Sequence, residues 1–268
     1  MAKLFRRKRK AASTPSGDGH MTLFEHLTEL RSRIIKSLLA VTVAGAVVFA
    51  FYVSLQHRLA GPYRDVCAAH PKLNCTGQFI AIDPLDPFAV RLKVAGYGGL
   101  ILAFPVVMWQ VWRFITPGLK PTEKRYAIPF ILTSVLLFSL GAALAFLTYE
   151  KALEFLLLFG GDVQAAFSVG KYMSLLMLLM LVFGLGFEFP VVLVALQMIG
   201  VVTHRKLLSW WRYAVVLIVV VDAVATPSGD PFSLLAMAVP MILFYFGAIG
   251  VGALIAKRRA RDAEVRLA

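Results

Sequence analysis

The chain alternates between long apolar stretches and shorter segments that carry most of its charged residues. An α-helix needs about 20 apolar residues to cross the hydrocarbon core of a membrane. Six stretches approach or exceed that length, at 37–57, 94–112, 126–149, 172–204, 207–225 and 231–256. The pattern therefore predicts an all-α membrane protein with six transmembrane helices.

Two of these stretches are less regular than the others. Glu188 and Pro190 interrupt the fourth stretch, and the fifth has Arg212 near one end and Asp222 near the other. Composition nevertheless supports the membrane assignment, because 59% of the chain is hydrophobic and only 16% is charged. A soluble domain usually carries about 25% charged residues.

Positive charge is sorted between alternate connections. The segments before 37, at 113–125, at 205–212 and after 256 together hold 21 of the 28 lysines and arginines. Because cytoplasmic loops carry the excess of basic residues, we expect both termini in the cytoplasm and three outward loops. The net charge of +13 then reflects topology and attraction to anionic membrane lipids, and no nucleic-acid partner is expected because no such motif is present.

The chain divides into three predicted parts. Residues 1–21 are basic and then rich in Ser, Thr, Pro and Gly, which is typical of a disordered cytoplasmic arm and not of a cleavable signal peptide. Residues 22–256 form the membrane domain, and 257–268 form a basic cytoplasmic tail. A capping-box spacing from Thr22 to Glu25 predicts a short amphipathic helix that leads along the cytoplasmic surface into the first span.

The three outward loops differ in character. The first, 58–93, contains several prolines, which predicts turns, and it holds both cysteines of the chain, Cys67 and Cys75. A disulfide bond between them can persist outside the cytoplasm, and two unpaired cysteines are the alternative. The second loop, 150–171, begins with a sequence typical of a short interfacial helix, and the third, 226–231, is a tight turn.

The sequence contains no catalytic constellation. It lacks a glycine-rich phosphate loop, a zinc-protease motif and a nucleophile elbow, so we predict no enzyme activity, no catalytic residue, no metal and no cofactor. The five histidines are scattered, and we expect them to be solvated surface residues. The methionines at 173, 177 and 180 are expected to pack between helices.

Four acidic residues need an explanation. Glu188 lies at membrane depth, where a carboxylate is costly and usually faces a cavity or a polar partner, although a helix end that dips into the interface would also explain it. Asp222 is closer to a span end, which favours solvation at the interface. Glu29 could pair with Arg33 one helical turn later, and Glu123 precedes a span, where an acid favours a helix N-terminus.

Four motifs resemble those of the TatC family, the polytopic receptor subunit of the twin-arginine protein translocase. They are His-Leu-x-Glu-Leu-Arg-x-Arg at 26–33, Pro-x-x-x-Trp-Gln-x-Trp-x-Phe-x-x-Pro-Gly-Leu at 105–119, Phe-Gly-x-x-Phe-Glu-x-Pro at 183–190, and Thr-Pro followed by Asp at 226–230. They occur in the family's order and cover about residues 22–256. Two features depart from the family pattern: Arg113 adds a positive charge, and Gly229 lengthens the last turn.

The resemblance implies a function. It implies a concave, glove-like bundle of six helices in the bacterial cytoplasmic (inner) membrane, which binds folded precursor proteins through signals with two adjacent arginines. Glu29 and Glu123 match the family's signal-binding carboxylates, Phe114 an aromatic beside them, and Glu188 an intramembrane contact for a partner.

The same resemblance implies partners and an energy source. They are single-span TatA- and TatB-type proteins, further copies of the chain, and the proton-motive force. A proton-coupled secondary transporter that uses Glu188 is the alternative.

Overall fold

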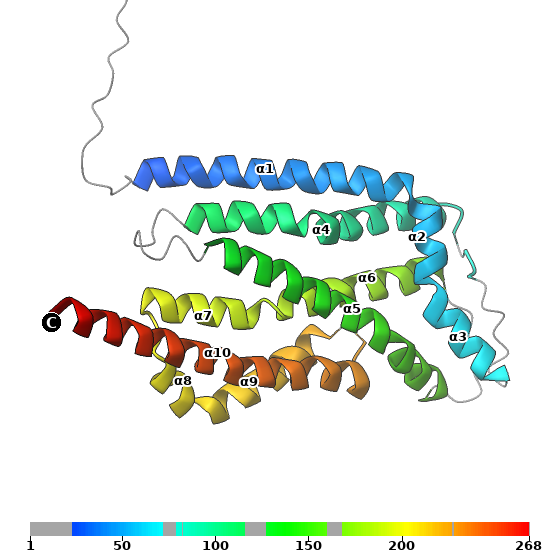
Figure 1. Cartoon of the computed structure of the whole chain (residues 1–268). Coiled ribbons are helices and arrows are strands. Elements are labelled where there is room, and N and C mark those ends of the chain that lie inside the picture. The colour runs from blue at the N-terminus through cyan, green and yellow to red at the C-terminus, as the bar shows by residue number, and fades with distance from the viewer. Residues whose placement is uncertain are drawn as a thin grey trace, which may run out of the picture.

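The computed structural model describes residues 23–71, 79–81, 83–115, 127–159, 168–226 and 228–267. Within these ranges the chain is helical, and its one isolated β-bridge joins Ile80 to Ser168. The longer helices lie roughly side by side, and α2 and α3 turn across one end of them (Figure 1). The helices are α1 (Leu23–Ala50), α2 (Tyr52–Leu59), α3 (Gly61–Ala69), α4 (Asp86–Ile115), α5 (Ala127–Phe159), α6 (Val169–Gly186), α7 (Phe189–Ile199), α8 (His204–Ser209), α9 (Trp211–Ala225) and α10 (Pro231–Leu267).

Five segments of the described chain are long and apolar enough to cross a membrane. They are Phe24–Ala50, Asp86–Ile115, Ala127–Phe159, Val169–Ile199 and Pro231–Arg258. The all-helical, multi-span architecture is therefore confirmed, whereas the predicted fifth span at 207–225 is not among these segments. That region is divided at Trp210 into α8 and the 15-residue α9, which is about 22 Å long at 1.5 Å per residue.

The N-terminal amphipathic segment and the first span form one helix. α1 runs without interruption through 28 residues, so the predicted separate helix along the membrane surface is wrong. The reason is local, since neither glycine nor proline occurs between Leu23 and Val43 and nothing breaks the hydrogen-bond ladder there. α10 likewise continues into the predicted basic tail as far as Leu267.

The segments predicted as outward loops contain more helix than the sequence suggested. Residues 58–93, predicted as turns, include α3 and the end of α2. Pro62 lies at the start of α3, where a missing N–H costs the helix nothing. The predicted interfacial helix after residue 150 is the continuation of α5, which ends at Phe159.

Cys67 is the described half of the predicted disulfide. It is buried on α3 and is disulfide-bonded, whereas Cys75 lies outside the described residues. The pairing of these two residues stays a prediction, which a peptide map of the unreduced protein tests.

The predicted fourth span is broken in its middle. α6 ends at Gly186, and α7 begins at Phe189. Pro190 has no N–H to continue the ladder, which explains the break. α7 then ends at Ile199, and the next residue, Gly200, has a φ of 83°, the left-handed conformation that glycine adopts readily.

An aromatic cluster joins the short helix α3 to the longer helices α5 and α6. The ring of Tyr172 on α6 packs against the rings of Tyr63 and Tyr149, at centroid distances of 5.8 and 5.4 Å. Its hydroxyl donates a hydrogen bond to Leu59 O at 2.9 Å. All three tyrosines are almost fully buried, so this cluster fixes α3 against α5 and α6.

The backbones of α1 and α4 approach each other closely at two glycines. A Cβ atom added to Gly99 would lie 2.8 Å from the Cα of Gly45, and one added to Gly45 would lie 3.1 Å from Ala95 O. Small residues at helix crossings allow such close backbone packing in membranes. Gly45 and Gly99 therefore allow α1 and α4 to pack backbone against backbone at this crossing.

We predict that Gly99→Leu prevents stable folding. The side chain would collide with the backbone of α1 and destabilise the protein by about 3 kcal/mol or more. The matched control is Gly96→Leu, because nothing lies within 4 Å of a Cβ added at that position of the same helix. Fluorescence-detected size exclusion should show a monodisperse peak for Gly96→Leu and its loss for Gly99→Leu, and equal peaks would contradict the packing argument.

Candidate functional site

Five side chains from α1 and α4 meet near the N-terminus of α1. His26, Glu29 and Arg33 are spaced by three and four residues, which places them on one face of a helix. Gln110 and Phe114 are spaced by four residues on α4. α1 and α4 lie side by side (Figure 1), so the row of three residues on α1 faces the row of two residues on α4. We call these five residues the α1–α4 site.

Polar contacts join the two rows at Arg33. Its Nη2 donates to Glu29 Oε1 at 2.8 Å, and its Nη1 donates to Gln110 Oε1 at 3.2 Å. The side chains of Arg33 and Glu29 are 16% and 19% exposed. The ion pair that the sequence predicted between Glu29 and Arg33 is therefore present, and Gln110 extends it to α4.

This network leaves two buried polar atoms unused. Glu29 Oε2 and Arg33 Nε are shielded from solvent and have no hydrogen-bond partner within the described residues. A buried acceptor without a donor costs about 1–3 kcal/mol. A ligand that brought an N–H group to Glu29 Oε2 would remove that cost.

Phe114 lies in the same site and stacks on His26. The two ring centroids are 4.3 Å apart, with an interplanar angle of 20°, and both side chains are half-buried. The structure thus places Phe114 against His26, which lies one turn before Glu29 on α1. The prediction that His26 is a solvated surface residue is wrong. Its spacing from Glu29 and Arg33 places it on their face of α1, but that spacing does not indicate its stacking partner on α4.

Two other residues complete the account of this region. Glu123, the second predicted carboxylate, lies outside the described residues. Arg113, which adds a charge to the sequence motif, is exposed. The described part of the site therefore contains one carboxylate and one guanidinium.

Glu188 is held at the break between α6 and α7. Its side chain is 8% exposed, and its carbonyl accepts from Val192 N at 3.0 Å to start α7. The fully buried hydroxyl of Ser134 on α5 lies close enough to interact with the carboxyl group. Neither Ser134 Oγ nor Glu188 Oε1 makes a hydrogen bond within the described residues, so both keep capacity for a further polar contact.

Asp222 on α9 contradicts the expectation of solvation at the interface. It is completely buried, and neither carboxylate oxygen has a hydrogen-bond partner in the described part of the chain. The prediction considered only that Asp222 lies near the end of a span. It was wrong because α9 packs against α10 and this packing covers the side chain.

Gly229 has a conformational role in the turn between α9 and α10. Its φ is 62°, a left-handed conformation in which most other residues are strained. Its N–H donates to Thr226 O at 3.3 Å, and Asp230 Oδ1 then accepts from Ser233 N at 2.7 Å to cap α10. The extra residue is therefore accommodated because it is glycine.

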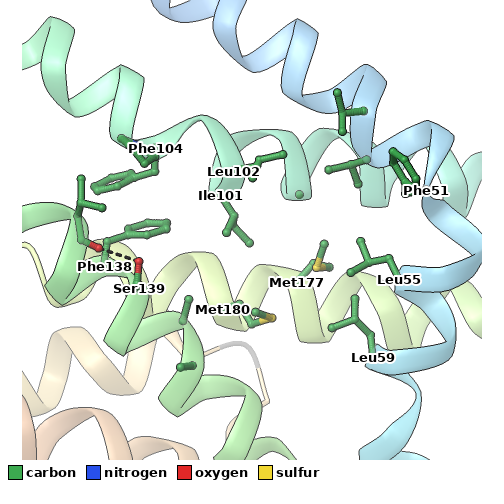
Figure 2. Close-up of a pocket in the computed structure, with 17 residues that line it drawn as sticks. Phe51, Leu55, Leu59, Ile101, Leu102, Phe104, Phe138, Ser139, Met177 and Met180 are labelled. Atoms are coloured by element: carbon green, nitrogen blue, oxygen red, sulfur yellow. Dashed lines mark hydrogen bonds between the residues drawn. The ribbon is translucent and has the colours of Figure 1, made fainter.

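An apolar cavity of about 640 Å³ lies between α1, α2, α4, α5 and α6. Figure 2 shows Leu55, Leu59, Ile101 and Met177 pointing into it. Its lining hydroxyl, that of Ser139, donates to Val135 O, and no ionisable side chain lines it. Glu188 is not among the lining residues, so the cavity can accept apolar groups but offers no charge.

Met173 and Met177 are core residues, as the sequence predicted. They are 0% and 3% exposed and pack in the main hydrophobic cluster. Among the described residues no group of three histidines, cysteines or acids could hold a metal ion.

Comparison with known proteins identifies the family. The family model described as Sec-independent protein translocase protein (TatC) matches residues 25–240. TatC of Frankia casuarinae is 39% identical over 92% of this chain and 70% of that protein, and TatC of Carboxydothermus hydrogenoformans is 36% identical over 85% of this chain and 91% of that protein.

Solved structures agree with this result. A crystal structure of the twin-arginine translocase receptor TatC is 35% identical, has a TM-score of 0.67, and covers 86% of this chain and 99% of that chain. A second crystal structure, in the detergent DDM, is 36% identical and has a TM-score of 0.71. It covers 85% of this chain and 99% of that chain. The sequence motifs, the multi-span helical fold and these matches lead to one assignment: the chain belongs to the TatC family and is a membrane subunit of the Sec-independent protein translocase, not an enzyme.

Proposed function

We propose that this chain is the receptor that binds twin-arginine signals of folded precursor proteins. The observation that carries this proposal is the Glu29 carboxylate, which sits between α1 and α4 with Oε2 unused and the Phe114 ring in the same site. A guanidinium group binds a carboxylate through two parallel hydrogen bonds. A carboxylate oxygen without a hydrogen-bond partner, on a helix face that also contacts an aromatic ring, suits an arginine that is followed by apolar residues.

Glu123 provides the second carboxylate in this proposal. Two adjacent arginines carry two positive charges, and the α1–α4 site offers one negative charge that Arg33 already balances. A single exposed ion pair contributes only about 0–1 kcal/mol. A second acid is therefore required for tight binding, and Glu123 follows α4 closely enough in sequence to supply it.

The proposed orientation places both termini in the cytoplasm of a bacterium. The basic residues before 37 and after 256 support this orientation, and the α1–α4 site then faces the side from which precursors arrive. α9 serves as the sixth span in this arrangement. Its short length is accommodated by local adjustment of the bilayer.

The proposed partners are TatA- and TatB-type single-span proteins and further copies of this chain. α9 supports a docking role because it presents exposed apolar side chains along its length, among them Val216, Val220 and Val224. Transport energy comes from the proton-motive force in this proposal. The subunit recognises the precursor and organises assembly.

Co-purification with a precursor tests the proposal. A precursor with two adjacent arginines should be retained by the purified protein, and the same precursor with two lysines should be retained at least tenfold less, a difference of about 1.4 kcal/mol. Equal retention would contradict the proposal. Small-molecule flux catalysed by the purified protein alone would instead support the proton-coupled transporter.

A further inference from the structure

Glu29 already binds an arginine that belongs to the same chain. Arg33 contacts Glu29 Oε1 at 2.8 Å, and it approaches from the next turn of α1. The described part of the proposed signal site is therefore occupied by the chemical group that it is proposed to recognise.

The contact is built so that it can be exchanged. Arg33 uses one nitrogen on one carboxylate oxygen, and Glu29 Oε2 and Arg33 Nε are left without partners. A two-bond guanidinium–carboxylate contact is stronger than this single one. Arg33 also has a second anchor, Gln110 Oε1 at 3.2 Å, which would hold its side chain when Glu29 is taken by a ligand.

We propose that Arg33 is a resident competitor whose displacement makes the site select arginine over lysine. The inference rests on the proposed function and adds a specificity-determining residue to it. An incoming guanidinium can displace Arg33, because it forms two bonds to Glu29 where Arg33 forms one. A lysine ammonium is a point charge without the planar fork, so it gains too little at this carboxylate to displace Arg33.

Arg33→Gln tests the inference with purified protein and two labelled signal peptides, one with two arginines and one with two lysines. Removing the competitor should tighten binding of the arginine peptide less than twofold and that of the lysine peptide about fivefold, within the 0–1 kcal/mol that a partly exposed ion pair contributes. Discrimination between the two peptides should fall accordingly.

Arg31→Gln is the matched control. It removes the same charge two residues away from an exposed position of α1, so it reports any general electrostatic effect on cationic peptides. It should leave discrimination unchanged. An equal loss of discrimination in Arg31→Gln and Arg33→Gln would overturn the inference.

Arg33→Lys covers the case in which Arg33→Gln does not fold. A lysine keeps the positive charge but cannot contact Glu29 and Gln110 together through a fork, so discrimination should lie between those of the wild type and of Arg33→Gln. Weaker binding of the arginine peptide in either variant, or unchanged discrimination in both, would overturn the inference.

Glu29→Ala distinguishes failure of the competitor inference from failure of the proposed function. If Glu29→Ala binds the arginine peptide as well as the wild type does, the proposed function fails. If Glu29→Ala weakens binding and the Arg33 variants also weaken it, the signal site stands and Arg33 is a positioning residue, not a competitor.

Discussion

Glu29→Ala is expected to weaken binding of a twin-arginine precursor by about ten- to a hundredfold, the value of a hydrogen bond to a charged group. The substitution removes both carboxylate oxygens from the α1–α4 site, including the unpartnered Oε2. It also leaves the Arg33 guanidinium without its counter-ion, so that the site repels the signal. Glu123→Ala should have a similar effect, and the double variant should bind less than either single variant.

Site-specific crosslinking of a precursor to each variant in membranes measures this effect. Glu150→Ala is the control, since it removes a carboxylate from the C-terminal half of α5, whereas Glu123 precedes α5 in the sequence. This variant should bind the precursor normally. Folded protein should accumulate in all variants, because Arg33 keeps its bond to Gln110 when Glu29 is absent. Wild-type crosslinking by the double variant would rule out these carboxylates as the signal site.

Glu188→Ala is expected to reduce export about tenfold or more while leaving precursor binding intact. A carboxyl group in the membrane interior is costly unless polar partners satisfy it. Ser134 lies beside the Glu188 carboxyl group, but Glu188 Oε1 makes no hydrogen bond within the described residues. We therefore expect that a polar group of a partner helix completes its contacts. Alanine removes this contact, and its effect should correspond to about 1.4 kcal/mol or more.

Glu188→Gln distinguishes two roles of this side chain. Glutamine keeps the size and hydrogen-bonding capacity but cannot ionise. Substantial export by Glu188→Gln would indicate a hydrogen-bonding contact, and export as low as that of Glu188→Ala would indicate a required charge. Ser134→Ala is the companion variant, because its hydroxyl interacts with the carboxyl group from α5.

Export and precursor binding must be measured on the same membranes. Normal export by both Glu188 variants would leave this residue without a functional role. Loss of binding together with export would place the defect in folding or in the signal site, and not at the break between α6 and α7.

Hydropathy and helical spacing were sufficient for much of the fold and for two of the five residues of the α1–α4 site. The membrane helices are long and apolar, and Glu29 and Arg33 are one turn apart, so local rules apply to them. Gln110 and His26 were not predictable in the same way, because their contacts cross between α1 and α4. Their partners depend on how two helices that are far apart in the sequence pack against each other.

The errors have two origins. Asp222 was expected to be solvated because only its position along one helix was considered, and its burial comes from the packing of α9 on α10. Gly61 and Pro62 suggested a turn, but the same residues begin α3. A sequence pattern alone does not distinguish a proline that ends a helix from one that starts it.

The glycine crossing between α1 and α4 has a consequence for the thermodynamics of recognition. Gly45 and Gly99 bring the two backbones into direct contact, so the rows that carry Glu29 and Phe114 are held in place before any ligand arrives. A receptor that is rigid in advance loses little conformational entropy on binding. The entropy lost on complex formation then falls mainly on the signal peptide, a flexible segment that must adopt one conformation. Affinity should accordingly vary more with the stiffness of the bound peptide than with changes in the surrounding helices.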